Sequence, residues 1–208
     1  MRVLLADDHA IVRRGTRELL VEEFPNADFV EVSTGEAAVA SLGTKFDVAI
    51  IDLSMPGRGG LDAVKAMHER APRLQIVVMS QHAESTYAVR ALRSGARAYV
   101  TKDSATDELV RAVRAVRAGR TYVSASIASA LADAVANPPS ATPHDLLSDR
   151  ELQVLRMLGK GQSIKDIASE LALSDKTAST YRRRILDKLA LTTTAELIRY
   201  AMSAKLVD

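Results

Sequence analysis

Short apolar runs alternate along residues 1–118 with longer stretches in which apolar residues recur every three or four positions. The short runs predict β-strands at 3–6, 28–32, 48–52, 76–80 and 98–101. The longer stretches predict amphipathic helices at 10–21, 35–42, 60–70, 84–94 and 105–118. Regular alternation of strand and helix is typical of a parallel sheet covered by helices on both faces. The pattern therefore predicts an α/β, flavodoxin-like fold with a doubly wound, five-stranded parallel sheet.

The pattern changes after residue 119. Tyr122 and Val123 could dock as an extended piece, and 124–136 predicts a short, weakly amphipathic helix. The segment NPPSATP follows at 137–143 and holds three of the chain's six prolines. Because proline lacks a backbone donor and interrupts both helices and strands, this segment predicts a linker.

The last part of the chain shows only helical patterns, and a capping residue precedes each of them. The four predicted starts are at Ser148, Ser163, Ser174 and Thr193. Four short helices with tight turns predict a second, all-α domain.

Within this domain, 164–171, the turn 172–174 and 175–189 have helix-turn-helix spacing. We therefore expect a first domain at 1–120, a linker at 121–144 and a helix-turn-helix domain at 145–208.

Composition narrows the class of protein only a little. The 208 residues are 47% hydrophobic and 26% charged, as in ordinary soluble domains. The absence of cysteine excludes disulfides and thiolate metal sites and fits a reducing compartment. The longest apolar runs are far shorter than the ~20 residues that span a bilayer. The N-terminus meets Asp7 too early for a signal peptide. We therefore expect a cytoplasmic protein with no membrane partner.

Polar residues collect where the predicted strands end. Asp7 and Asp8 follow the first strand, Asp52 ends the third, Ser80 ends the fourth and Lys102 follows the fifth. The carboxyl ends of parallel strands form one rim of the sheet, where ligands bind. Three carboxylates need a cation among them, and an all-oxygen site suits Mg²⁺. A carboxylate can also accept a phosphoryl group, and Asp52 on the central strand is best placed for that role.

Simpler interpretations exist for each part alone. Asp7 and Asp8 could be a helix N-cap pair, and an aspartate at a strand end such as Asp52 is unremarkable. The coincidence with Ser80 and Lys102 favours the phosphoacceptor site. His9 is interpreted as a rim residue because Mg²⁺ does not favour imidazole.

The motifs DDH, IIDLSMPG, the serine after IVVM and AYVTK resemble a bacterial response-regulator receiver over about 1–120. The resemblance implies phosphoryl transfer from a histidine kinase to Asp52, with Mg²⁺ as cofactor. It also implies a switch in which Ser80 moves toward the phosphoryl group while Tyr99 turns inward. From its charge and position alone, Lys102 is expected to pair with a phosphoryl oxygen. Two departures are a serine where threonine is commoner and Lys102-Asp103 where Lys-Pro is common, which leaves the geometry of that bond open.

The predicted helix 175–189 has two different faces. Ala178, Ile185 and Leu189 form a stripe that we expect to be buried. The other face and its flanks carry hydroxyls and cations that suit base edges and phosphates, at Lys176, Ser179, Thr180, Arg182, Arg183, Arg184 and Lys188. A run such as RRR could also be a solvated helix face.

The sequence from LSDREL to LDKL resembles the LuxR-type helix-turn-helix over about 146–203, and the whole chain resembles the NarL/FixJ response regulators. The resemblance implies base reading by Ser179, Thr180 and Arg183. It implies phosphate contacts by Thr177, Arg182, Arg184 and Lys188. Ala178 stands where valine is frequent, and Tyr181 stands where histidine is frequent.

The expected function is a two-component response regulator and not an enzyme. A sensor histidine kinase would phosphorylate Asp52, and a homodimer would then bind double-stranded DNA. Leu197, Ile198, Ala201 and Met202 offer apolar surface for a dimer contact.

Two alternatives belong to other classes. One is an Mg²⁺-dependent phosphotransferase or phosphatase, which would need an acid/base group and a lid that the sequence does not indicate. The other is a constitutive DNA binder whose receiver only dimerises.

The last predicted receiver helix and the residues after it carry an arginine stripe, at Arg111, Arg114, Arg117 and Arg120. This stripe could face solvent or a partner, and we favour solvent.

Overall fold

The computed structural model describes residues 1–55, 59–81, 85–103, 106–124, 127–128, 132, 142–171 and 173–207. The chain divides into two compact units, Met1–Pro138 and Pro139–Asp208. Most of the helix predicted at 124–136 and of the proline-rich segment lies outside the described residues. No helix in the described part is long and apolar enough to cross a membrane.

The first unit is built on a parallel sheet with the strand order β2-β1-β3-β4-β5-β6. Every neighbouring pair of strands is parallel. This order confirms the predicted flavodoxin-like, doubly wound class. In the described residues the strands are β1 (Arg2–Ala6), β2 (Asp28–Val32), β3 (Val48–Asp52), β4 (Gln75–Ser80), β5 (Ala98–Thr101) and β6 (Tyr122–Val123).

The sheet has six strands where the sequence predicted five. The extra strand is β6, whose Tyr122 and Val123 pair with Ala98 and Tyr99 of β5. The backbone N–H of Tyr122 also donates to the carbonyl of Arg97 at 3.0 Å. Two residues are too short to show a period, so the sequence indicated only an extended piece here. The sheet thus continues into the segment predicted as linker.

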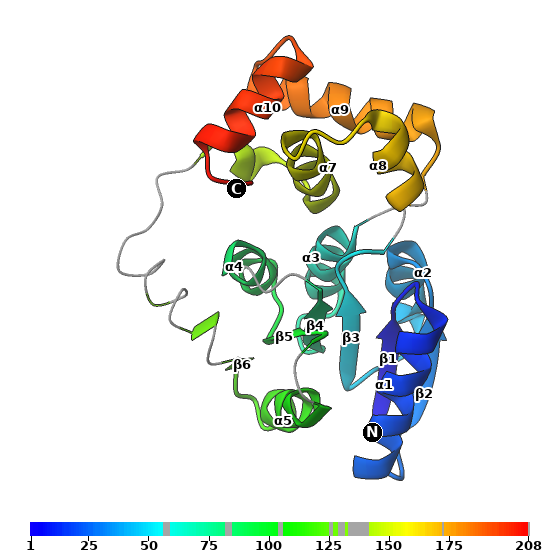
Figure 1. Ribbon diagram of the computed structural model, residues 1–208. Coiled ribbons are helices and arrows are strands. Elements are labelled where there is room, and N and C mark those ends of the chain that lie inside the picture. The colour runs from blue at the N-terminus through cyan, green and yellow to red at the C-terminus, as the bar shows by residue number, and fades with distance from the viewer. Residues whose placement is uncertain are drawn as a thin grey trace. The chain divides into compact units, whose positions relative to one another are not determined.

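Helices cover both faces of this sheet (Figure 1). Helices α1 (Ala10–Glu23) and α5 (Thr106–Arg117) pack on one face, and α2 (Gly35–Ala40), α3 (Gly60–Arg70) and α4 (Ser85–Arg93) lie on the other. All five predicted helices are present. The second ends two residues early because the chain tightens into the 3₁₀ turn η1 (Ser41–Gly43).

The core under α1 and α5 follows the two-residue period of the strands. Alternate residues such as Val3, Leu5, Val48 and Ile50 are buried there against α1 and α5. The intervening residues of β1 and β3 are buried too, so these two strands are almost continuously apolar, as expected for a parallel sheet covered on both faces. Full burial of each large aliphatic side chain contributes about 1.5–3 kcal/mol.

Gly60 allows α3 to begin directly against the end of β3. A Cβ atom at this position would lie 2.2 Å from the carbonyl oxygen of Asp52 and 2.5 Å from the Cα atom of Leu53. The backbone N–H of Gly60 instead donates to the carbonyl of Leu53 at 3.2 Å. Only glycine permits this close approach beside Asp52.

The second unit is helical throughout its described part. It comprises the 3₁₀ turn η2 (Pro143–Leu146), α7 (Asp149–Gly159), α8 (Ile164–Glu170), α9 (Asp175–Leu189) and α10 (Thr194–Ser203). The four predicted caps are confirmed, because Ser148, Ser163, Ser174 and Thr193 each accept a hydrogen bond from a backbone N–H in the first turn. The all-α class is therefore confirmed, and η2 is an element that the sequence did not indicate.

Candidate functional site

Asp7, Asp8 and Asp52 meet at the carboxyl ends of β1 and β3, as the sequence predicted. These strands are neighbours, with Ala6 paired to Ile51, so Asp7 and Asp52 emerge side by side. Together with His9, these acids each offer an atom suited to metal coordination, all within 4.8 Å of one another. Asp7 and Asp52 are buried, whereas Asp8 and His9 are exposed. The site lies where the winding of the sheet reverses, between β1 and β3.

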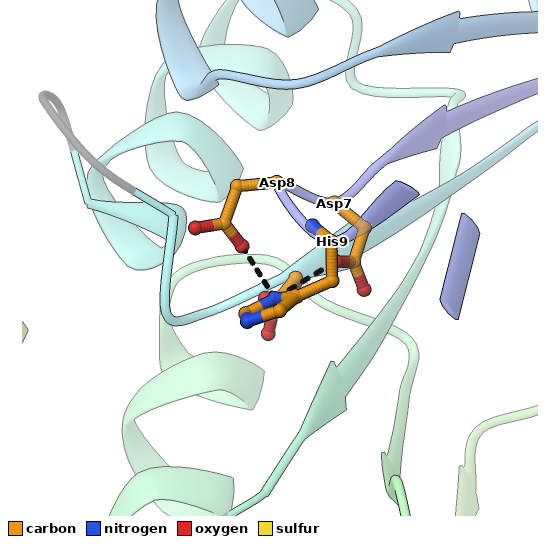
Figure 2. A group of neighbouring side chains, drawn as sticks. Asp7, Asp8 and His9 are labelled. Carbon is orange, nitrogen blue, oxygen red and sulfur yellow. Dashed lines mark hydrogen bonds and ion pairs between the residues drawn. The ribbon is translucent and has the colours of Figure 1, made fainter. Parts of the chain in front are cut away.

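His9, interpreted from the sequence as a rim residue, contacts both Asp7 and Asp8. Its Nδ1 atom is 2.8 Å from an oxygen of Asp8 and 3.4 Å from an oxygen of Asp7 (Figure 2). The backbone N–H of His9 donates to Asp7 Oδ1 at 2.8 Å. His9 therefore orients both carboxylates at the start of α1, a contact that residue type alone did not indicate.

Lys102 bridges the two buried carboxylates. Its Nζ atom lies 2.8 Å from Asp7 Oδ2 and 2.9 Å from Asp52 Oδ2, and its side chain is only 8% exposed. Its backbone N–H donates to the carbonyl of Ser80 at 2.7 Å, which fixes the start of the loop after β5. The bond between Lys102 and Asp103, left open by the sequence, is not cis.

Burial sets the electrostatics of Asp52. Removal from water raises the pKa of the Asp52 carboxyl above its ordinary value, the charge of Lys102 opposes this, and Asp7 raises the pKa further. The backbone N–H of Ser54 donates to Asp52 Oδ1 at 3.2 Å. Burial lowers the pKa of Lys102, but the carboxylates of Asp52 and Asp7 raise it by more, so the ammonium stays charged. The site is therefore a buried, basic carboxylate held beside a fixed cation.

Ser80 and Tyr99 lie on the strands next to this cluster. Ser80 is the last residue of β4 and pairs with Thr101, while Asp52 pairs with Met79, so Ser80 and Asp52 are at the same edge. Ser80 and Tyr99 are both fully buried. Tyr99, which the family resemblance implies turns inward on activation, is therefore already buried in this structure.

Helix α9 presents the predicted buried and exposed faces. Ala178, Ile185 and Leu189 are buried, which confirms the predicted stripe. Of the candidate DNA-binding residues, the exposed ones are Lys176, Thr180, Arg183, Arg184 and Lys188, and the half-buried ones are Thr177, Ser179 and Arg182.

Four of these candidates already make side-chain contacts within the helical unit. The hydroxyl of Thr177 is 2.8 Å from the hydroxyl of the cap Ser174. Lys188 Nζ lies 2.6 Å from Glu151 Oε2 on α7. Arg182 donates to the hydroxyl of Thr194 at 3.3 Å, at the start of α10. The Thr180 hydroxyl donates to the carbonyl of Lys176 at 2.8 Å and keeps its acceptor capacity. The exposed cations Lys176, Arg183 and Arg184 are therefore the α9 charges that remain accessible to DNA.

The arginine stripe of α5 also makes contacts within its own unit. Arg114 pairs with Glu23 of α1, and the guanidinium of Arg117 lies 5.6 Å from the ring centre of Phe24. Arg111 donates to the carbonyl of Asp107 at 3.3 Å. Part of the stripe thus fastens α5 to the C-terminal end of α1.

Known proteins with the same architecture match both units. The family described as response regulator receiver domain matches residues 3–114, and the family of bacterial regulatory proteins, luxR family, matches 145–201. The response regulator UvrY of Escherichia coli K12 is 37% identical over 205 residues, covering 97% of this chain and 94% of UvrY. The oxygen regulatory protein NreC of Staphylococcus haemolyticus is 35% identical over the full length of both chains.

Solved structures agree with these sequence matches. The RcsB response regulator of Salmonella typhimurium superposes with a TM-score of 0.60 at 28% identity, covering 98% of each chain. A LuxR-family response regulator from Aurantimonas sp. SI85-9A1 reaches a TM-score of 0.60 at 36% identity, covering 65% of this chain and 98% of that one.

A receiver with an acidic rim, followed by a LuxR-type helical domain, defines a two-component response regulator with a DNA-binding domain. Both halves match in that order, and the relatives match over nearly their whole length. The chain belongs to the NarL/FixJ family of response regulators.

Proposed function

We propose that Asp52 accepts a phosphoryl group and that this modification controls DNA binding through α9. The observation that carries the proposal is the bridge from Lys102 to Asp7 and Asp52, which gathers buried acids and a fixed cation at one edge of the sheet. The receiver would occupy 1–120, a linker 121–144 and the DNA-binding domain 145–208, in a cytoplasmic protein.

Asp52 is the proposed nucleophile because it is buried at the end of β3, lies beside the ammonium of Lys102 and has a raised pKa. One carboxylate oxygen attacks the phosphorus of a phosphohistidine, and the P–N bond breaks as the imidazole of the kinase leaves. Its other oxygen keeps the backbone N–H of Ser54 as a partner. The proposed donor is a sensor histidine kinase.

The acidic cluster fits Mg²⁺. The carboxylates of Asp7, Asp8 and Asp52 supply hard oxygen ligands within 4.8 Å of one another, the donor type that Mg²⁺ prefers. When bound, Mg²⁺ would offset the charge on the transferred phosphoryl group. His9 would orient Asp8 by hydrogen bonding instead of binding the ion.

The switch is proposed to work by a population shift. A phosphoryl group adds nearly two negative charges, so Lys102 gains a new partner and exchanges its contact with Asp52 for a phosphoryl oxygen. The hydroxyl of Ser80 donates to another phosphoryl oxygen. Tyr99 lies on β5, between β4 and β6. It is proposed to move with Ser80 and so to change the receiver surface.

DNA recognition is assigned to the outer face of α9. Ser179, Thr180 and Arg183 would read base edges, while Thr177, Arg182 and Arg184 would contact phosphates. A structure of the related response regulator RcsB in complex with DNA supports this use of the fold.

Helix α10 supplies a surface for the proposed homodimer. Met202 is 59% exposed there, and its neighbour Ile198 is half-buried. Two copies would place two α9 helices on half-sites about one helical turn of DNA apart. The reported structure of RcsB dimers bound to DNA supports this assembly.

The test compares wild type with Asp52→Asn in DNA binding, with and without a small-molecule phosphodonor and Mg²⁺. Intact mass is read on the same samples. Wild type is expected to gain one phosphoryl group and to bind more tightly, and the variant to do neither.

Two results would contradict the proposal. A wild type that takes no phosphoryl group, or binds DNA equally well in both states, would favour a constitutive DNA binder. Release of the phosphoryl group to an added acceptor substrate in many turnovers would favour a phosphotransferase.

A further inference from the structure

The first turn of α7 contacts the turn that precedes α9 and also the last turn of α9. Arg150 is 7% exposed, and its Nη2 atom donates to the carbonyl of Leu171 at 2.9 Å. Leu171 ends α8, three residues before the cap of α9 at Ser174. Arg150 therefore holds the turn from which α9 begins.

Glu151, the next residue, holds the other end of α9. Its side chain is 3% exposed, and its Oε2 atom lies 2.6 Å from Nζ of Lys188 in the last turn of α9. The same oxygen accepts the backbone N–H of Ser148 at 2.7 Å, so the carboxylate is fixed by the capping box of α7. The contact of Arg150 with Leu171 joins residues 21 positions apart in the sequence, and the contact of Glu151 with Lys188 joins residues 37 positions apart.

We propose that Arg150 and Glu151 act as a clamp that sets the tilt of α9, and that Lys188 is a positioning residue and not a contact to DNA phosphate. The inference rests on the proposed function, in which α9 reads DNA. It changes the role that family resemblance implies for Lys188.

The position of Lys188 argues against a phosphate contact. Reaching for DNA would remove its ammonium from Glu151 and leave a buried carboxylate without its cation, which is strongly unfavourable. Arg184, one turn earlier, has an exposed side chain and is the better phosphate contact. Lys188 thus helps to hold α9 in place through its ion pair with Glu151 and leaves DNA contact to other residues of the helix.

The two roles predict different salt dependence. Each phosphate contact contributes about 0.9 to the slope of log K against log salt concentration. A positioning residue leaves that slope unchanged and affects base reading instead. Misplacement of α9 should therefore weaken binding to a specific sequence more than binding to arbitrary DNA.

The experiment uses the full-length protein and two DNA duplexes. One duplex is selected from a random pool by the wild-type protein, and the other is its scrambled counterpart. Lys188→Met, Glu151→Gln, the double variant and Lys188→Arg are compared with Arg184→Met, the matched phosphate control. Glu151→Gln keeps the capping box, because glutamine also accepts the N-cap hydrogen bond, so this variant is expected to fold.

Lys188→Met and Glu151→Gln should each bind the selected duplex about tenfold more weakly (about 1.4 kcal/mol) and the scrambled duplex as wild type does. The double variant should be no worse than either single variant, and Lys188→Arg should restore specific binding. The salt slope should stay at the wild-type value in all of them, whereas Arg184→Met should lower it by about 0.9.

A slope lowered by about 0.9 in Lys188→Met, with normal specific binding in Glu151→Gln, would overturn the clamp and make Lys188 a phosphate contact. Equal weakening on both duplexes in Glu151→Gln would also overturn it. A failure of the proposed function looks different, because wild type itself would then bind selected and scrambled duplexes alike, and Arg184→Met would leave the slope unchanged.

Discussion

Single residues decide how closely the backbone packs around the candidate phosphoacceptor site. Gly60 is the sharpest case, since a Cβ atom there would collide with the backbone of Asp52 and Leu53. The neighbouring Gly59 has no such contact within 4 Å. The two glycines stand side by side in the sequence, and only the structure distinguishes their roles.

Gly60→Ala should destabilise the first unit by about 1–3 kcal/mol, because the methyl group must displace main-chain atoms. It should also slow phosphorylation of Asp52 by shifting the end of β3. Gly59→Ala is the control and should leave both properties near wild type. Urea denaturation and phosphodonor labelling followed by mass would measure the effects, and equal behaviour of the two variants would contradict the steric argument.

Ala190 is a residue under local backbone strain. It ends α9 in the left-handed region, at a φ of 53°, which costs a residue with a Cβ atom about 1 kcal/mol. Ala190→Gly should therefore stabilise the helical unit by about that amount.

Ala204, which ends α10 at a φ of −83°, gives the matched control. Ala204→Gly should destabilise slightly, because glycine gains freedom in the unfolded chain without relieving strain. Loss of amide NMR signals of α9 and α10 in urea would measure both changes. A destabilising Ala190→Gly would refute the argument.

At the scale of elements, capping boxes hold the starts of α7, α8 and α10 and carry acid-sensitive stability. Hydrogen bonds from the backbone N–H groups of Thr192 and Thr193 lower the pKa of Glu196 below its ordinary value. A hydrogen bond from the Ser163 hydroxyl similarly lowers the pKa of Asp166. In both cases the folded state favours the ionised carboxylate.

The sign of the pH effect follows from this. Because the folded pKa of Glu196 lies below the unfolded value, its stabilisation is full above the unfolded pKa and is lost as pH falls through the folded pKa. Glu196→Gln should therefore flatten part of the acid-induced loss of α10 stability. Amide hydrogen exchange of α10 across mildly acidic pH would measure it, and an unchanged pH profile would contradict the assignment.

Most elements could be predicted from sequence because their signals are local. The caps, the apolar runs of β1 and β3 and the acids that follow them need only neighbouring residues. β6 and η2 were not predicted, because each is too short to show a period of apolar residues. The pairing of Lys188 with Glu151 escaped because a charged helix residue looks the same whether its partner is DNA or a carboxylate 37 positions away. The contacts of His9 with Asp7 and Asp8, its two neighbours in the sequence, were also missed, because residue type alone does not show where the side chain points.

At the scale of the whole molecule, the chain is two units with separate cores. Control of DNA binding by Asp52 therefore needs the receiver to be attached. The isolated fragment 139–208 should bind the selected duplex with no response to a phosphodonor, while the full chain responds. A binding titration with both proteins would test this. A fragment that still responded would place the sensitive residue outside the receiver.

The short strand β6 bears on how such proteins are recombined. It adds Tyr122 and Val123 to the free edge of β5, the strand that also carries Tyr99. A chimaera joined at residue 120, where the helical pattern ends, would discard this edge and expose the backbone of β5 to foreign pairing. A junction placed after Val123 would keep the sheet whole. When receivers and DNA-binding domains are exchanged between proteins, the segment to transfer therefore runs through Val123, so that it includes β6.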